Sequence, residues 1–154
     1  TQQAATKVPA EATAFAKKVA AANAFEIQTS QLAKDKGQST DVKSFADKMV
    51  SDHTKAGDNF KAALQSANIT GIDEKLDAKK QAVLSRLQKL SGASFDNAYA
   101  KAQLDAHKEA VALVRSYSKS GKTPALKDWA GKTLPTLEEH LKSITDISKR
   151  VPKA

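Results

Sequence analysis

Residues 40–68 read TDVKSFADKMVSDHTKAGDNFKAALQSAN and carry apolar side chains at alternating steps of three and four. This spacing is typical of one face of an α-helix, so the stretch predicts a long amphipathic helix capped by Ser39 or Thr40. The inward stripe consists of Val42, Phe45, Ala46, Met49, His53, Ala56, Phe60, Ala63 and Ala67. His53 is therefore an ionisable side chain in a row that the core should bury.

Three further segments show the same periodicity and are separated by glycine and proline. They run from Pro9 to Lys36, from Ser94 to Lys119, and from Thr123 to about Arg150. Pro9 suits the first helical position and Ser94 suits a cap. Pro135 lies inside the last segment and cannot donate a backbone hydrogen bond, so we expect a kink near Leu134.

The connections between these segments predict their topology. Residues 37–39 and 120–123 are short enough to force antiparallel hairpins, whereas residues 69–93 form a crossover with an amphipathic piece at 73–90. We therefore expect an all-α four-helix bundle of two antiparallel hairpins joined by a helical crossover. It would form a single domain over residues 9–151, after a disordered tail at 1–8. An up-down bundle without a crossover is the alternative.

The composition supports this fold class and limits the chemistry. The 154 residues suit one domain, and 28 Ala, 22 Lys and only 5% aromatic residues favour helices over a β-sandwich. There is no cysteine, which excludes disulfides, thiolate metal sites and cysteine nucleophiles. The three histidines, the carboxylates and one methionine are the remaining candidates for metal or acid–base chemistry.

The net charge of +8 is spread along the chain and is carried by 22 Lys against 3 Arg, which argues against specific nucleic-acid binding. No stretch approaches the roughly 18 apolar residues of a transmembrane segment. The chain begins at Thr1 with small and polar residues, as expected after removal of a signal peptide. We therefore expect a periplasmic or secreted protein. The sequence predicts no particular protein partner.

Each of the other three long helices also places one ionisable residue in its apolar stripe, namely Glu26, His107 and His140. Counting residues from the hairpin turns puts Glu26 within about 5 Å of the level of His53, with a similar offset in the second hairpin. Three imidazoles and a carboxylate at one level are a reasonable ligand set for one transition-metal ion. Glu26, His53, His107 and His140 are therefore the predicted ligands, for zinc, copper or iron. No organic cofactor is predicted.

Further residues are candidates for supporting roles. Met49 lies one turn before His53 and could add a thioether suited to copper, although packing is the simpler interpretation. Asp96 and Tyr99 are possible partners of the ligands. Asp52, Glu138 and Glu139 are also possible partners, although we expect them to face solvent. Trp129 is most simply a packing anchor.

The sequence does not predict an enzyme, because it lacks a Gly-rich phosphate loop, a Gly-x-Ser-x-Gly elbow and a His-Glu-x-x-His motif. A metal-dependent redox activity is the one catalytic role left open. The alternative to a metal centre is a structural or protein-interaction bundle, in which a buried His/Glu network without metal fixes the register of the helices.

Four groups of residues carry a resemblance to a known family. They are Phe25-Glu26 with Leu32-Ala33, Val42 to Ala46 leading to Asp52-His53, Phe95 to Tyr99 leading to His107, and Leu134 to Leu137 leading to His140. Together they resemble the bacterial domain-of-unknown-function family 4142, whose members are labelled outer-membrane or periplasmic proteins. The resemblance implies an exported, ferritin-like four-helix fold in which Pro135 is a regular feature. It implies no activity.

The chain departs from di-iron ferritins in one respect. Their Glu-x-x-His pairs need a glutamate three residues before each histidine, where this sequence has Val50, Leu104 and Leu137. We therefore do not expect a carboxylate-bridged di-iron centre, ferroxidase activity or iron storage.

Overall fold

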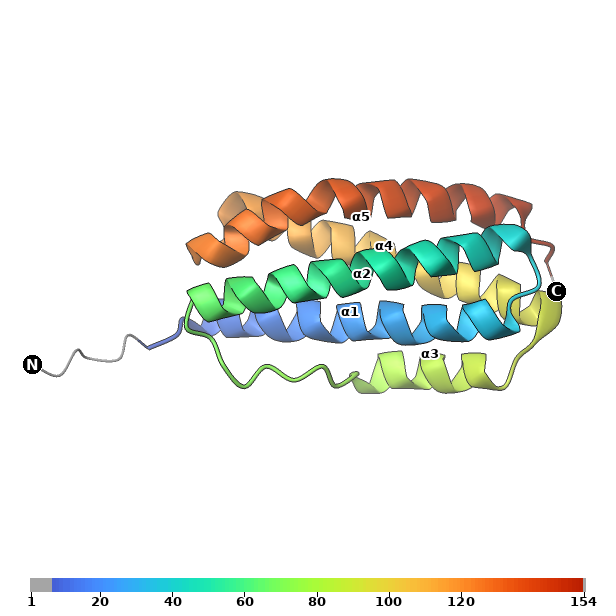
Figure 1. The fold of residues 1–154 in the computed structure, drawn as a ribbon, viewed down its shortest axis with the longest axis horizontal. Coiled ribbons are helices and arrows are strands. Elements are labelled where there is room, and N and C mark those ends of the chain that lie inside the picture. The colour runs from blue at the N-terminus through green and yellow to red at the C-terminus, as the bar shows by residue number, and fades with distance from the viewer. Residues whose placement is uncertain (1–6, 154) are drawn as a thin grey trace, which may run out of the picture.

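The structure, a computed structural model, describes residues 7–153, which form helices and connections without any strand. The helices are α1 (Ala10–Lys36), α2 (Thr40–Ser66), α3 (Ala78–Gln88), α4 (Gly92–Ser120) and α5 (Pro124–Arg150). Four of them are long and lie side by side, and the short α3 lies outside them (Figure 1). The predicted all-α bundle is confirmed. The predicted disordered tail at 1–8 lies, apart from its last two residues, outside the described residues.

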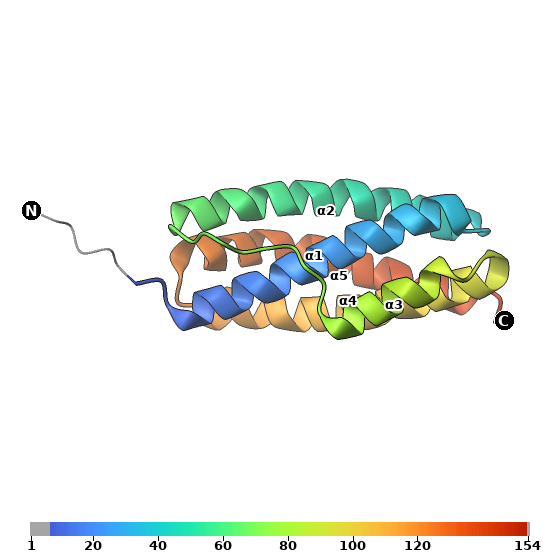
Figure 2. The same ribbon diagram turned by 90° about the horizontal axis from the view of Figure 1, so that it is seen from below.

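The chain order of the helices determines their directions. α1 and α2 form one antiparallel hairpin and α4 and α5 form another, while α2 packs against α5 and α1 against α4 (Figures 1 and 2). The segment between α2 and α4 runs back along the bundle, and α3 packs against α1 and α4 within it. The predicted crossover is therefore present, and α2 and α4 run in the same direction.

Two predicted helix starts are wrong. Pro9 is the N-cap of α1 in extended backbone, and its carbonyl accepts from Thr13 N, so the helix begins one residue later. α4 begins at Gly92 rather than after a Ser94 cap, because the Ser91 carbonyl already accepts from Phe95 N. Gly92 has φ 60°, a left-handed conformation that glycine adopts at no steric cost.

The crossover is less helical than its apolar spacing predicts. α2 ends in a Schellman motif, in which Ile69 N donates to Leu64 O and Asn68 takes the left-handed φ of 56°. The expected helix at 73–90 is limited to residues 78–88, because the Asp77 side chain accepts from Lys80 N and caps α3 there. Residues 73–77 are therefore not helical.

α5 continues through Pro135 without interruption, and Figure 1 shows it bent rather than straight. The fold thus accommodates a residue that removes one backbone hydrogen bond. Across residues 7–153, no helix combines the length and the apolar character that crossing a membrane would need.

Two apolar clusters fill the bundle and a polar layer separates them. One cluster contains Phe15, Phe60, Tyr117 and Trp129, and the other contains Phe45, Met49, Phe95, Tyr99 and Ile144. Apart from Asp96, which lies near the start of α4, the buried polar residues of each long helix fall between positions that belong to the two clusters. These residues are Glu26, Thr29, Ser30, His53, Gln103, His107 and His140. The fold therefore places all four predicted ligands in one buried layer.

Candidate metal centre

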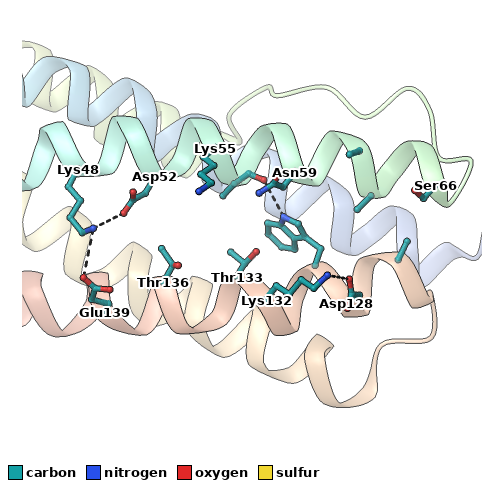
Figure 3. Close-up of a pocket in the computed structure, with 15 residues that line it drawn as sticks. Lys48, Asp52, Lys55, Asn59, Ser66, Asp128, Lys132, Thr133, Thr136 and Glu139 are labelled. Carbon is teal, nitrogen blue, oxygen red and sulfur yellow. Dashed lines mark hydrogen bonds and ion pairs between the residues drawn. The ribbon is translucent and has the colours of Figure 1, made fainter.

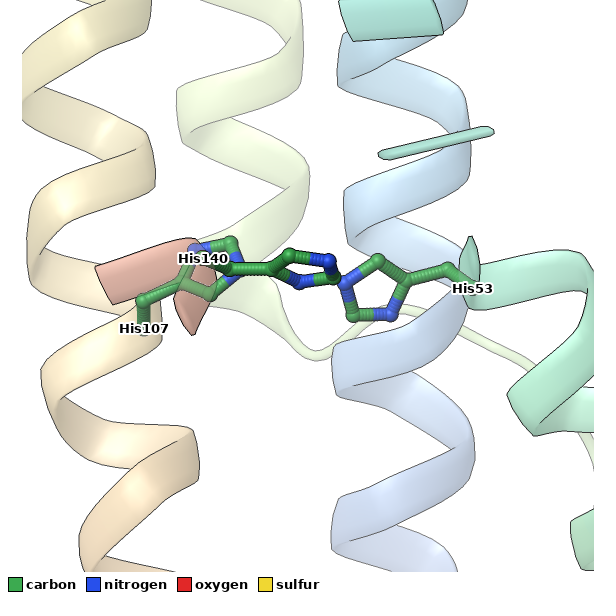
Figure 4. A group of neighbouring side chains, drawn as sticks. All are labelled: His53, His107 and His140. Carbon is green, nitrogen blue, oxygen red and sulfur yellow. The ribbon is translucent and has the colours of Figure 1, made fainter. Parts of the chain in front are cut away.

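Three histidines from three helices meet in the polar layer (Figure 4). His53 comes from α2, His107 from α4 and His140 from α5, and all three are buried. One ring nitrogen from each lies within 4.8 Å of one from each of the others. The ring centroids are 5.3–5.8 Å apart. The predicted convergence of the histidines is thus present in the fold.

Hydrogen bonds to oxygen atoms determine which nitrogen of two rings carries a proton. His107 Nδ1 lies 2.9 Å from the carbonyl oxygen of Gln103, and His140 Nε2 lies 2.7 Å from Asp52 Oδ2. A carbonyl or a carboxylate accepts only, so each of these nitrogens is the N–H donor. His107 Nε2 and His140 Nδ1 therefore carry free lone pairs.

The third ring follows the same rule. His53 Nδ1 lies 3.0 Å from Asn23 Oδ1, an amide oxygen that can only accept, so His53 Nε2 is left with a lone pair. Among the described residues, His53 Nε2, His107 Nε2 and His140 Nδ1 are buried with no hydrogen-bond partner. The arrangement leaves one unused acceptor on each of three neighbouring rings.

The environment keeps all three rings neutral. Burial lowers the pKa of His53 well below its ordinary value, and the neighbouring histidines lower it further. Burial also lowers the pKa of His107 to about 4, against the hydrogen bond to Gln103. The pKa of His140 is lowered by burial as well, although Asp52 opposes the shift. Neutral imidazole is the form that binds metal ions.

The donor set fits a transition-metal ion. Zn–N distances of about 2.0–2.1 Å would place three imidazole nitrogens about 3.3–3.6 Å apart. Starting from separations of up to 4.8 Å, each ring would need to move by less than about 1 Å. In addition, each ring donates its other N–H to an oxygen, which is the usual arrangement behind metal-bound histidine.

Glu26 lies beside this group rather than within it. Its Oε1 is 3.8 Å from His107 Nδ1, which is the protonated nitrogen of that ring. Burial raises the pKa of Glu26 to about 8, while Gln103 and Lys80 exert smaller lowering effects. Near neutral pH the contact therefore joins two neutral groups and is not an ion pair. Oε2 is buried and has no partner among residues 7–153.

The other predicted supporting residues lie in different surroundings. Met49 is fully buried in the apolar cluster with Phe45. The Tyr99 hydroxyl hydrogen-bonds Ser30 Oγ at 2.7 Å. Asp96 accepts backbone N–H groups from residues 38 and 39, at 3.0 and 2.7 Å, and so holds the turn between α1 and α2. Asp96 therefore stabilises a helix connection.

The sequence indicates one of the two side chains that orient the rings and gives no indication of the other. Asp52 is a candidate partner of the ligands that we expect to face solvent, but its side chain is only 27% exposed and it bonds His140. Asn23, which lies one turn before Glu26 on the same helix, is not among the predicted residues. The one sequence feature that relates to Asn23 is the glycine at position 57 inside a predicted helix. A Cβ at this position would meet Asn23 Nδ2 at 2.7 Å, so a glycine leaves room for the Asn23 side chain. Glu138 and Glu139 face solvent as expected, at 46% and 65% exposed.

Comparison with known proteins identifies a family and a fold. A family model described as a domain of unknown function (DUF4142) matches residues 1–147. The chain is also similar to the crystal structure of a DUF305 fragment from Deinococcus radiodurans, with a TM-score of 0.79 and 13% sequence identity. The match covers 93% of this chain and 98% of that chain. At this identity the likeness concerns the fold alone. No curated protein matches the chain.

Proposed function

This chain belongs to the DUF4142 family, whose description gives no function, and from the geometry of its polar layer we propose that it binds one transition-metal ion inside the bundle. The ligand atoms would be His53 Nε2, His107 Nε2 and His140 Nδ1. Glu26, which the sequence suggested as a fourth ligand, would instead lie beside His107 and would not contact the ion. We propose no reaction for the centre.

The observation that carries this proposal is the set of three buried lone pairs without donors. A buried polar atom without a partner costs about 1–3 kcal/mol. In a purely structural His/Glu network, donors from the protein would reach these nitrogens, and residues 7–153 supply none. A cation shared by the three nitrogens removes all three costs at once, which favours a metal centre over the structural alternative.

The donor types restrict the ion. Three neutral imidazoles suit zinc, copper and iron, and they are poor ligands for magnesium or calcium. Three protein ligands would leave a coordination position for water or another small molecule. The predicted export of the protein and its ferritin-like classification remain proposals that rest on the family resemblance.

Metal titration of untagged protein tests the proposal. The chain has three histidines, no cysteine and a single tryptophan, so the candidate ligands and the fluorophore are unambiguous. Metal-free protein at pH 7.5 would be titrated with zinc, copper(II), cobalt(II) and iron(II) by calorimetry. We expect one ion per chain, nitrogen hyperfine structure in the copper(II) spectrum, and quenching of Trp129 by copper(II) or cobalt(II).

The control is His107→Leu, which removes one donor while keeping an apolar side chain of similar size. We expect it to lose high-affinity binding and the quenching. If the wild-type protein takes up none of the four ions, or if His107→Leu binds them equally well, the proposal is wrong.

A further inference from the structure

A small cavity adjoins the histidines on one side. It has a volume of about 40 Å³ and is lined by Glu26, His53 and His107, together with aliphatic side chains of α1, α4 and α5. His140 does not line it. The cavity therefore lies toward one side of the three nitrogens, where a position on the ion would be free of protein ligands.

Besides the histidines, the polar side chains that line the cavity are Asn23, Glu26 and Thr133. Glu26 Oε2 is buried and has no partner among residues 7–153, and its residue lines the cavity. The remaining wall is mainly aliphatic, which disfavours a charged occupant because an ion would lose its hydration there. Since one water needs about 10–15 Å³ of such space, the volume suits two or three heavy atoms.

A surface groove lies between α2 and α5 (Figure 3), and it shares lining residues with this cavity. The groove has a volume of about 680 Å³ and is lined by polar and charged side chains, including Lys48, Asp52 and Lys132. Ala56, Trp129 and Thr133 line both the groove and the cavity. These three residues therefore lie between the groove and the cavity.

Trp129 is the large member of these three residues, and it is held in place. Its Nε1–H donates to the Ala56 carbonyl at 3.2 Å, which links α5 to α2 across the groove. Its ring packs on Phe60 with centroids 4.6 Å apart. Trp129 is therefore the largest side chain that lies between the groove and the cavity.

We propose that the cavity binds a small neutral molecule of two or three heavy atoms, of the size of dioxygen, at the free position of the metal ion. Glu26 would hydrogen-bond this molecule, and Trp129 would control its passage from the α2–α5 groove. The inference rests on the proposed metal centre, because the ion supplies the remaining contact.

Xenon binding to the metal-free protein tests the cavity alone, because small apolar cavities take up xenon. We expect saturable methyl shifts in NMR spectra at Leu113 and Leu137, which line the cavity. Ala110→Leu should fill the cavity and abolish these shifts, with Ala22→Val as a milder filling variant. The matched control is Ala112→Leu on the exposed face of α4, which should leave them unchanged. Absence of the shifts in wild-type protein would overturn the inference.

Nitric oxide binding to iron(II)- or cobalt(II)-loaded protein tests the ligand position under anaerobic conditions. We expect a spectral change with nitric oxide and none with imidazole, which is too large for the cavity. Trp129→Ala should raise the association rate at least tenfold, whereas Trp129→Phe should raise it less. The inference is wrong if the metal-loaded protein does not bind nitric oxide, or if Trp129→Ala leaves the association rate of nitric oxide unchanged. Neither result would contradict the proposed metal centre. If no ion binds, the metal centre and this inference both fail.

Discussion

Asp52 Oδ2 lies 2.7 Å from His140 Nε2, and the same oxygen pairs with Lys48 Nζ at 3.0 Å. Lys48 also reaches Glu139 on α5 at 3.8 Å, so these contacts join α2 to α5 at the margin of the groove (Figure 3). Burial raises the pKa of Asp52, but the hydrogen bonds from His140 and Lys48 outweigh it and lower the pKa overall. An ionised Asp52 therefore holds His140 with Nδ1 free for the ion.

Replacing Asp52 with alanine should weaken metal binding without removing a ligand. The His140 ring would lose the acceptor that determines its tautomer and orientation, so we expect affinity to fall by about 10- to 100-fold. Asp128→Ala is the matched control, because Asp128 lines the same groove but pairs with Lys132. Calorimetric titration of both variants would show the difference. Equal affinities for the two variants would contradict the role of Asp52.

Replacing Gly57 with alanine should also lower metal affinity, because the new Cβ would displace the Asn23 amide that orients His53. Alanine in a helix interior is otherwise favoured over glycine by about 0.5–1 kcal/mol. Gly131→Ala on α5 is the control, since a Cβ there meets nothing within 4 Å. We expect it to stabilise the protein and leave metal affinity unchanged.

Both glycine variants would be compared by urea unfolding and by metal titration. If Gly57→Ala merely stabilises the protein as Gly131→Ala does, the Asn23 amide is free to move and does not determine the orientation of His53.

His107→Leu should separate the metal centre from a structural network. In the absence of metal, we expect its free energy of unfolding to equal or exceed that of the wild type, because a buried acceptor without a partner is removed. In the wild type, an ion at 100 times its dissociation constant should add about 2.7 kcal/mol, which the variant should not gain. A loss of more than about 2 kcal/mol in the metal-free variant would favour the structural interpretation.

The stability of the metal-free protein should peak near pH 6.5. Between pH 4.5 and 8 the unfolded Glu26 is ionised while the folded one keeps its proton, so this residue makes stability fall as the pH rises. Below pH 6.5 the three histidines bind protons in the unfolded protein but not in the folded protein, where their pKa values are lowered. Their contribution makes stability fall as the pH drops, and three histidines outweigh one glutamate there.

Above about pH 7.5 the unfolded histidines are mostly deprotonated, so the Glu26 effect dominates among these four groups, with a slope below about 1.4 kcal/mol per pH unit that fades above pH 8. Glu26→Gln should flatten this part of the profile, and Glu139→Gln at an exposed position should not. Urea unfolding between pH 5 and 8.5 measures both. A Glu26→Gln profile that still falls by the same amount would show that Glu26 is already ionised in the folded protein.

Prediction from sequence succeeded where the physics is local. The positions of His53, His107 and His140 follow from helical periodicity, and short connections made the hairpins predictable. Prediction failed where one helix had to be matched to another. Asp52 borders the stripe of its own helix and becomes a hydrogen-bond partner only because α2 packs against α5. Ser94 failed as a cap because Gly92 adopts a conformation that the pattern of residue types does not reveal.

The sequence by itself determined that the apolar stripe of each long helix contains an ionisable residue, because side chains repeat along a helix with a fixed period. Only the tertiary structure decided that one nitrogen from each of the three imidazoles lies close to the other two, and that Glu26 lies beside the protonated nitrogen of His107. The reason is that a ring's tautomer and direction depend on an oxygen across the helix interface or in the preceding turn. Asn23, Asp52 and the Gln103 carbonyl supply those oxygens, and together they leave one nitrogen without a partner on each of three neighbouring rings.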